Sequence, residues 1–161
     1  MLTELVDPLQ SFTEGLPPAL QWAGVALIAA IPFVESYFGS TIGVLTGLNP
    51  SVAVPAAIVG NVVSMVIIVS LAGKGRDLAT GGSTRGEEGG RHARLRRAFN
   101  RWGVPGVSLL GQTMLPSQIT SAAMVGFGAD RRAVILWQCV SITLWGVAFG
   151  ALAASGVALL G

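Results

Sequence analysis

Residues 19–48 read ALQWAGVALIAAIPFVESYFGSTIGVLTGL, with a single charge at Glu35. The stretch is longer than the roughly 20 apolar residues that cross a bilayer as one helix. Pro32 and the polar run Glu35-Ser36-Tyr37 interrupt it near its middle. Non-helical backbone at membrane depth is tolerated only where protein or a wet cavity satisfies its hydrogen bonds. We therefore predict a re-entrant helical hairpin that is broken at Pro32 and returns to the side from which it enters.

The composition of the whole chain agrees with a membrane protein. Apolar residues make up 52% of the 161 residues, charged residues only 11%, and the mean hydropathy is +0.66. Soluble domains carry about a quarter of charged residues. Three further segments contain no charged residue: 50–73, 102–129 and 133–161. We predict an all-α, multi-pass protein of the cell (inner) membrane that forms one membrane domain.

The segment 102–129 repeats the pattern of residues 19–48. Its middle is polar, GQTMLPSQ, and contains Pro116. We predict a second re-entrant hairpin broken near Pro116, and the alternative is one spanning helix with a proline kink.

Basic residues indicate the orientation. The linker 74–101 holds eight of the ten Lys and Arg residues, and basic segments stay on the inner side of a membrane. Within it, residues 91–102 place Leu95, Phe99 and Trp102 at helical spacing among arginines, which predicts a basic amphipathic helix at the membrane surface; a solvated loop is the alternative. Nucleic-acid binding is disfavoured, because topology accounts for the basic patch. The arginines expected to meet lipid headgroups are Arg94, Arg97, Arg101, Arg131 and Arg132.

These elements form two similar halves. Residues 19–73 and residues 102–161 each give a hairpin followed by a span, with the cytoplasmic linker 74–101 between them. If both hairpins return to their own side, the two halves insert in opposite directions, which is an inverted repeat.

Glu35 is the strongest candidate for a functional residue, because no other ionisable group lies deep in an apolar stretch. A charge at the bilayer centre costs about 2.5–3.5 kcal/mol on insertion scales, so its surroundings favour the neutral form and suit it to carrying a proton or binding a cation. The alternative is a protonated carboxyl that caps the broken helix. The polar residues expected to line a pathway with it are Ser36, Tyr37, Asn61, Gln112, Thr113, Ser117 and Gln118. Those of the second hairpin could equally satisfy only the backbone that Pro116 frees.

Glycines at spacings of four predict close helix packing, within the chain or at a homodimer contact. They are Gly39, Gly43, Gly47, Gly146 and Gly150. Because four apolar stretches enclose little space, we expect a homo-oligomer, with a dimer favoured. No nucleophile–base pair, phosphate loop or metal-ligand cluster is present in the sequence, so we expect neither an enzyme nor a cofactor or metal site.

The chain resembles the small multidrug export family of prokaryotes, which is itself similar to the wider DedA, or SNARE-associated (VTT-domain), group. The resemblance rests on Glu35, on Gly47-Leu48-Asn49-Pro50 and on Gly60-Asn61 in the first half, and on Thr113-Met114-Leu115-Pro116 and 126–132 in the second. Tyr37 and Gln112 stand where the family tends to have arginine. The resemblance implies two re-entrant hairpins and proton-coupled transport, either small-molecule export or movement of a lipid carrier such as undecaprenyl phosphate.

Two functions follow as hypotheses. The first is a small secondary transporter or lipid flippase with Glu35 as the coupling group. The second is a non-transporting subunit or scaffold that packs against a larger membrane complex.

Overall fold

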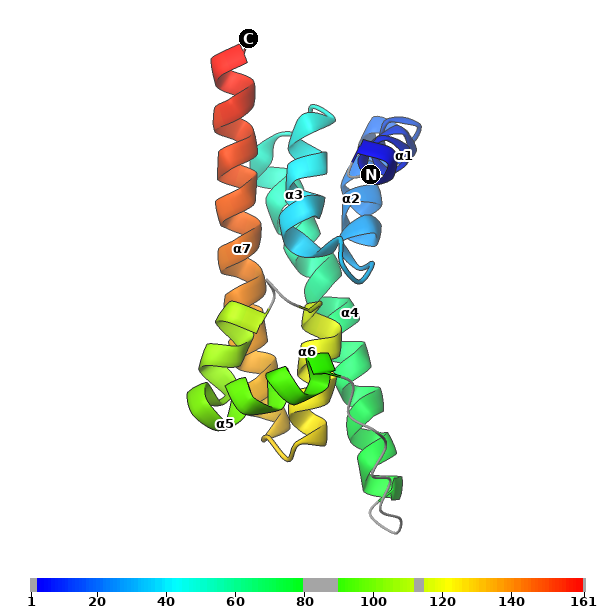
Figure 1. The fold of residues 1–161 in the computed structure, drawn as a ribbon. Coiled ribbons are helices and arrows are strands. Elements are labelled where there is room, and N and C mark those ends of the chain that lie inside the picture. Colours follow the sequence, from blue (N-terminus) through cyan, green and yellow to red (C-terminus); the bar gives the residue numbers. More distant parts are fainter. Residues whose placement is uncertain (1–2, 80–89, 112–114, 161) are drawn as a thin grey trace. The chain divides into compact units, whose positions relative to one another are not determined.

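The computed structural model describes residues 3–79, 90–111 and 115–160, and every element within these ranges is helical (Figure 1). The elements are α1 Thr3–Glu14, the 3₁₀ turn η1 Pro18–Leu20, α2 Gln21–Ala29, α3 Glu35–Leu45, α4 Pro50–Ala79, α5 Gly90–Gly111, α6 Ser117–Gly126 and α7 Arg131–Leu160. The all-α prediction is therefore confirmed for the described chain.

The first apolar stretch is broken where the sequence predicts. The helix α2 ends at Ala29 and α3 begins at Glu35, so Pro32 lies in the connection and the two helices run side by side in opposite directions (Figure 1). The break contains two residues with positive φ, Phe33 at 74° and Glu35 at 55°. With 9 and 11 residues, the two helices are each shorter than a membrane span.

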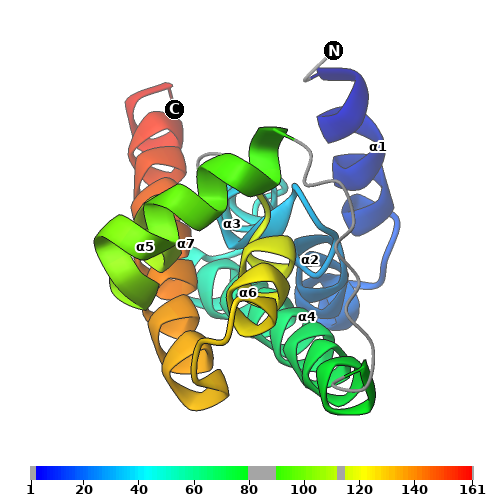
Figure 2. The same cartoon turned by 60° about the horizontal axis from the view of Figure 1, so that its bottom comes forward.

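The second apolar stretch is also divided between two helices. The helix α5 ends at Gly111, and α6 begins at Ser117 with Pro116 as its N-cap. Inside α5, Gly103 has φ 64° and ψ −169°, and the chain changes direction there. Figures 1 and 2 show the part of α5 before Gly103 running across α6, with the remainder beside α6. The part before the bend contains the basic helix that the sequence predicts at 91–102.

Two helices are long and apolar enough to span a membrane. These segments are Pro50–Ala72 in α4 and Arg131–Leu159 in α7. They correspond to the predicted spans 50–73 and 133–161. Length and composition thus agree with a membrane protein that carries two spanning helices and two shorter, broken pairs.

The chain divides into two compact units. Unit 1 comprises Met1–Val63 and Ile142–Gly161, and unit 2 comprises Ser64–Ser141. Each unit therefore contains one helical pair together with a part of α4 and a part of α7. Unit 1 has α1, α2 and α3, and unit 2 has α5 and α6.

The helical pairs of the two units end in the same hydrogen-bonded turn. After α3, the N–H of Gly47 donates to Val44 and that of Leu48 to Gly43. The turn after α6 has the same two bonds: the N–H of Gly128 donates to Val125, and that of Ala129 donates to Met124. Each of these residues follows its counterpart in the first turn by the same number of positions.

This pattern is the Schellman motif, in which a glycine with positive φ closes the helix. Gly47 has φ 85° and Gly128 has φ 103°. In both units a side chain then caps the long helix, since Asn49 Oδ1 accepts from the Ser51 N–H at 2.9 Å and Asp130 Oδ1 from the Ala133 N–H at 2.9 Å.

Candidate functional site

Glu35 opens α3 in unit 1, and its side chain is fully buried. It is an acidic residue in the first turn of a helix, where the helix dipole favours negative charge. Its φ of 55° is uncommon for a residue other than glycine and costs backbone energy of about 1–3 kcal/mol. Such strain persists only where the surroundings enforce it, and it concentrates at functional sites.

The charge balance of unit 1 sets Glu35 apart further. The residues of unit 1 include no Lys or Arg, and its other acids, Glu4, Asp7 and Glu14, belong to α1. Unit 1 therefore contributes no basic side chain of its own as a counter-charge for the Glu35 carboxyl.

The side chain of Ser36 joins two helices. Its hydroxyl is buried and donates to the carbonyl oxygen of Ile142 on α7 at 2.8 Å. This bond joins α3 to the part of α7 that belongs to unit 1. The role of Ser36 in the structure is thus to hold α3 in place beside Glu35.

Small residues let α3 and α7 approach closely around this bond. A Cβ added to Gly146 would lie 3.2 Å from Cβ of Ser36, and one added to Gly150 would lie 3.4 Å from Cβ of Ser40. On the other side of α3, a Cβ on Gly39 would lie 2.6 Å from Cβ of Ala29.

Two further glycines of α3 and the turn after it, Gly43 and Gly47, differ in their surroundings. A Cβ on Gly43 would lie 2.8 Å from Cβ of Ala53 on α4. Gly47 differs, because nothing lies within 4 Å of such a Cβ. The positive φ of the turn explains a glycine at this position, and packing of Gly47 at a homodimer contact stays a prediction.

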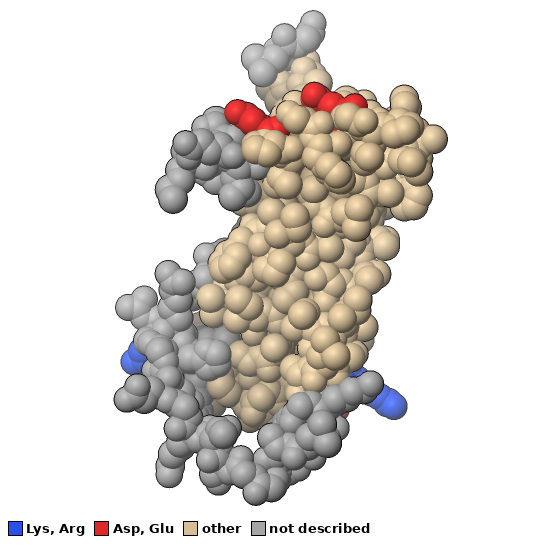
Figure 3. Space-filling model, turned by 90° about the vertical axis from the view of Figure 1, so that its right-hand side faces the viewer, with Lys and Arg blue, Asp and Glu red and all other residues tan. Residues whose placement is uncertain are grey.

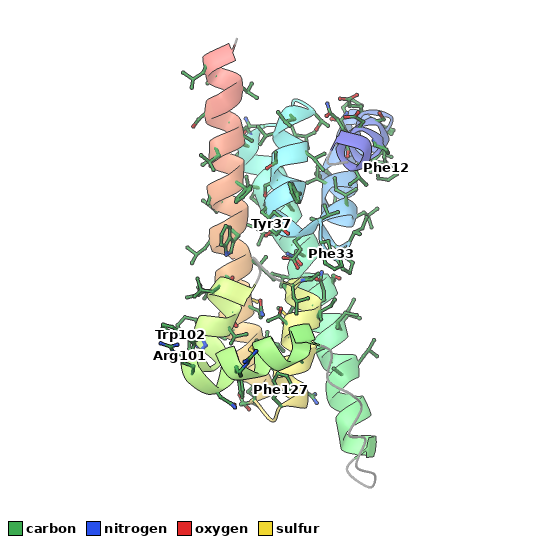
Figure 4. All side chains as sticks on the ribbon, in the orientation of Figure 1. Phe12, Phe33, Tyr37, Arg101, Trp102 and Phe127 are labelled. Atoms are coloured by element: carbon green, nitrogen blue, oxygen red, sulfur yellow. The ribbon has the colours of Figure 1, made fainter. Side chains whose placement is uncertain are left out.

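Tyr37 belongs to a half-buried aromatic cluster of unit 1. Its ring centroid lies 4.9 Å from that of Phe38 and 5.5 Å from that of Phe149, which itself lies 5.9 Å from Trp145. The Tyr37 hydroxyl donates to the carbonyl oxygen of Phe33 at 3.3 Å, and Phe33 lies at the break between α2 and α3 (Figure 4). The aromatic cluster thus covers the broken end of α3 that carries Glu35.

Asn61 is fully buried on α4, one residue after the closest helix contact of unit 1. A Cβ on Gly60 would overlap the carbonyl oxygen of Ala26, so α2 and α4 touch backbone to backbone. The residues around this contact are small and apolar: Val25, Ala29, Ala56 and Ala57. The contact between the hairpin and its long helix in unit 1 is therefore closely packed.

Unit 2 buries the polar residues of α6. Ser117, Gln118, Thr120 and Ser121 are almost without exposed surface. The Gln118 amide donates to Ser64 Oγ at 3.5 Å, and the Thr120 hydroxyl donates to Leu115 O at 3.4 Å. Ser117 and Gln118 lie at the break as expected, and much of their hydrogen bonding is local. Gln112 and Thr113 lie outside the described residues.

The sequence prediction missed a second polar group in unit 2. Ser108 on α5 and Gln138 and Ser141 on α7 are all fully buried, and the Ser141 hydroxyl donates to the carbonyl oxygen of Ser108 at 2.7 Å. The spacing of three between Gln138 and Ser141 in an uncharged helix was the available signal, since it places both on one face.

The basic residues gather at the end of unit 2 where α6 stops. Phe99 on the first part of α5 lies 5.9 Å, ring centroid to ring centroid, from Phe127, which follows α6. Arg101 lies over the exposed ring of Trp102, 5.3 Å from its centroid, and Figure 4 shows both side chains projecting outward from α5.

Other arginines lie on the same two helices. Arg97 on α5 and Arg132 at the start of α7 are exposed, and Arg131 is half-buried. For Arg94 the structure describes only the backbone. On the face shown in Figure 3, the described surface is largely uncharged.

Comparison of the chain with protein-family models, with curated proteins and with solved structures finds no match. Among the described residues, no group of three His, Cys, Asp or Glu side chains is arranged to hold a metal ion. The burial, charge and contacts of the residues therefore form the basis for assigning a function.

Proposed function

We propose that the protein is a small membrane transporter in which Glu35 couples proton movement to the export of small molecules or to the flipping of a lipid carrier. The observation that carries this proposal is the buried carboxyl of Glu35 at a strained break between two helices too short to span a membrane. Buried ionisable groups at membrane depth are expensive and mark ion or proton pathways. Protonation removes the charge and so lowers the cost of moving the broken helix end between environments.

The test uses purified protein in liposomes with an imposed pH gradient. Ethidium serves as the small-molecule probe and a fluorescent polyprenyl phosphate as the lipid-carrier probe. Wild-type protein is expected to move one probe in a gradient-dependent way, and Glu35→Gln and Glu35→Ala to reduce that rate at least tenfold. Glu14→Gln is the matched control, because Glu14 is an exposed acid of the same unit. Movement of neither probe by the wild type, or full activity in both Glu35 variants, contradicts the proposal.

We also propose that the two units form an inverted repeat with re-entrant hairpins. The repeated Schellman turn and cap support a duplicated unit. The charge distribution supports opposite insertion, since all ten basic residues fall within unit 2 and none within unit 1. The basic end of unit 2 then faces the cytoplasm, where Arg97, Arg101 and Arg132 meet anionic headgroups, each contact contributing about 1 kcal/mol.

Cysteine labelling in intact cells tests this orientation. In a Cys139→Ser background, Ser51→Cys is expected to react with a membrane-impermeant maleimide added outside. Ala129→Cys, at the corresponding turn of unit 2, is expected to react only after the cells are opened. Labelling of both positions from the same side contradicts the inverted repeat.

The alternative, a subunit of a larger membrane complex, is favoured by one observation. Only 17% of the apolar window of α7 is buried, against 39% for α4. A second copy of the chain or an unrelated partner would cover this surface as lipid does. Purification in mild detergent separates these outcomes: a stoichiometric unrelated protein supports the subunit function, and a homodimer active alone in liposomes excludes it.

A further inference from the structure

The contact between α5 and α7 in unit 2 contains hydrogen-bonding groups that the described residues leave unused. Gln138 is fully buried, and neither Nε2 nor Oε1 of its side chain has a partner within the described ranges. The same holds for Oγ of Ser108. A glutamine amide offers two donors and one strong acceptor, and a serine hydroxyl offers one donor and two acceptor positions.

Ser108 and Gln138 belong to the two helices that meet at this contact, α5 and α7. The hydrogen bond from Ser141 Oγ to Ser108 O fixes Ser108 of α5 against α7. Gln138 precedes Ser141 by three positions, so both lie on the face of α7 that meets α5. From this bond and this spacing, we infer that the amide of Gln138 and the hydroxyl of Ser108 lie near the same helix–helix contact.

Leaving such groups dry is costly. Burying an amide or hydroxyl without a hydrogen bond costs about 1–3 kcal/mol by protein mutational data and more in a hydrocarbon surrounding. Lipid cannot supply the missing bonds. A small molecule that both donates and accepts hydrogen bonds removes the penalty.

The chemistry of the cluster selects the ligand. Its members carry no charge, and Arg131 and Arg132 precede Gln138 by about two helical turns. An ion thus gains no counter-charge from the cluster, whereas a neutral molecule with donors and acceptors matches both side chains. Water is the smallest such molecule, and buried waters in proteins bind groups of this kind with about three hydrogen bonds each.

We propose that the side chains of Gln138 and Ser108 bind an internal water molecule at the α5–α7 contact of unit 2. The site does not depend on transport by the protein. The corresponding contact of unit 1, where Gly60 meets the carbonyl of Ala26, is formed largely by small apolar residues.

Solid-state NMR of the protein in lipid bilayers tests the proposal. With ¹⁵N-labelled glutamine, magnetisation is transferred selectively from water to the side-chain amides. The signal of Gln138 is assigned by its loss in Gln138→Leu. We expect rapid transfer from water to the Gln138 amide, close to that of the half-buried Gln10 and Gln21, and at least a twofold reduction of this transfer in Ser108→Ala.

Ser155→Ala is the matched control, because Ser155 is an exposed serine of α7. It is expected to leave the Gln138 signal unchanged. The proposal is overturned if the Gln138 amide receives no magnetisation from water or receives it only from protein protons. It is equally overturned if Ser108→Ala and Ser155→Ala have the same effect. Unchanged melting of both serine variants shows that the fold is retained in the comparison.

Discussion

The two hairpins end in the same turn but contact their long helices with opposite chemistry. In unit 1, α2 meets α4 through Gly60 and a group of alanines, so backbone touches backbone. In unit 2, α5 meets α7 through Ser108, Gln138 and Ser141. The turn is a local feature set by one glycine, whereas each contact depends on residues far apart in sequence. A duplicated unit can therefore keep its turns and still diverge where its helices touch.

The units also differ in charge. Unit 1 has only acids, and one of them, Glu35, is buried at the broken helix. Unit 2 has every basic residue of the chain and no buried acid among its described residues. The features that suit a proton carrier and those that suit an anionic membrane surface are thus separated between the units.

The largest expected effect comes from adding a side chain at the close contact between α2 and α4. Gly60→Ala places a Cβ against the carbonyl of Ala26, and we expect a loss of unfolding free energy of about 3 kcal/mol, because backbone rather than a flexible side chain must move. Thermal unfolding in detergent measures the effect. The matched control is Gly156→Ala, which meets open space and should be neutral or slightly stabilising. Equal melting of the two variants would show that the close contact of α2 and α4 is not present.

The shared turn predicts equal effects in both units. Gly47→Ala and Gly128→Ala each force a side chain into a positive φ, and we expect each to cost about 1–2 kcal/mol. Gly126→Ala is the control, since Gly126 is helical, without positive φ, and also meets open space. The same melting measurement applies. A large effect at only one of the two turn glycines would argue against a repeated turn.

The smallest expected effect concerns the buried serine bonds that join helices in each unit. Ser36→Ala removes the bond to Ile142 O, and Ser141→Ala removes the bond to Ser108 O. We expect each to cost about 0.6–1 kcal/mol, as helix-to-helix hydrogen bonds in membrane proteins do. Denaturant titration in mixed micelles resolves a difference of this size. Thr41→Ala serves as control, because the Thr41 hydroxyl bonds only within its own helix, to Tyr37 O.

Much of the fold was predictable because it follows from composition along the chain. Uncharged length predicted the two spans, and Pro32 and Pro116 predicted the breaks, since a proline cannot donate its share of the helix hydrogen bonds. The arginine-rich amphipathic pattern predicted the first part of α5. The candidate site was predicted in part, because Glu35 stands out as a charge in an apolar stretch.

Other site residues could not be assigned from sequence. Ser36 looks like a pathway residue by type, yet it is used to join α3 to a carbonyl of α7 that lies over a hundred positions away. Gln138 and Ser141 looked like isolated polar residues in a span, and their importance depends on Ser108 facing them. A hydrogen bond is decided by where its partner folds, which one segment cannot report.

The sequence by itself determined which segments are helical, where they break and which carry charge, because these properties depend on local hydrophobicity, proline and glycine. Only the tertiary structure decided which helix faces touch, that Gly60 closes one contact while Ser141 bonds to Ser108 at the other, and that Gly47 takes a positive φ in a turn. Helix contacts join residues distant in sequence, and their chemistry depends on both partners at once.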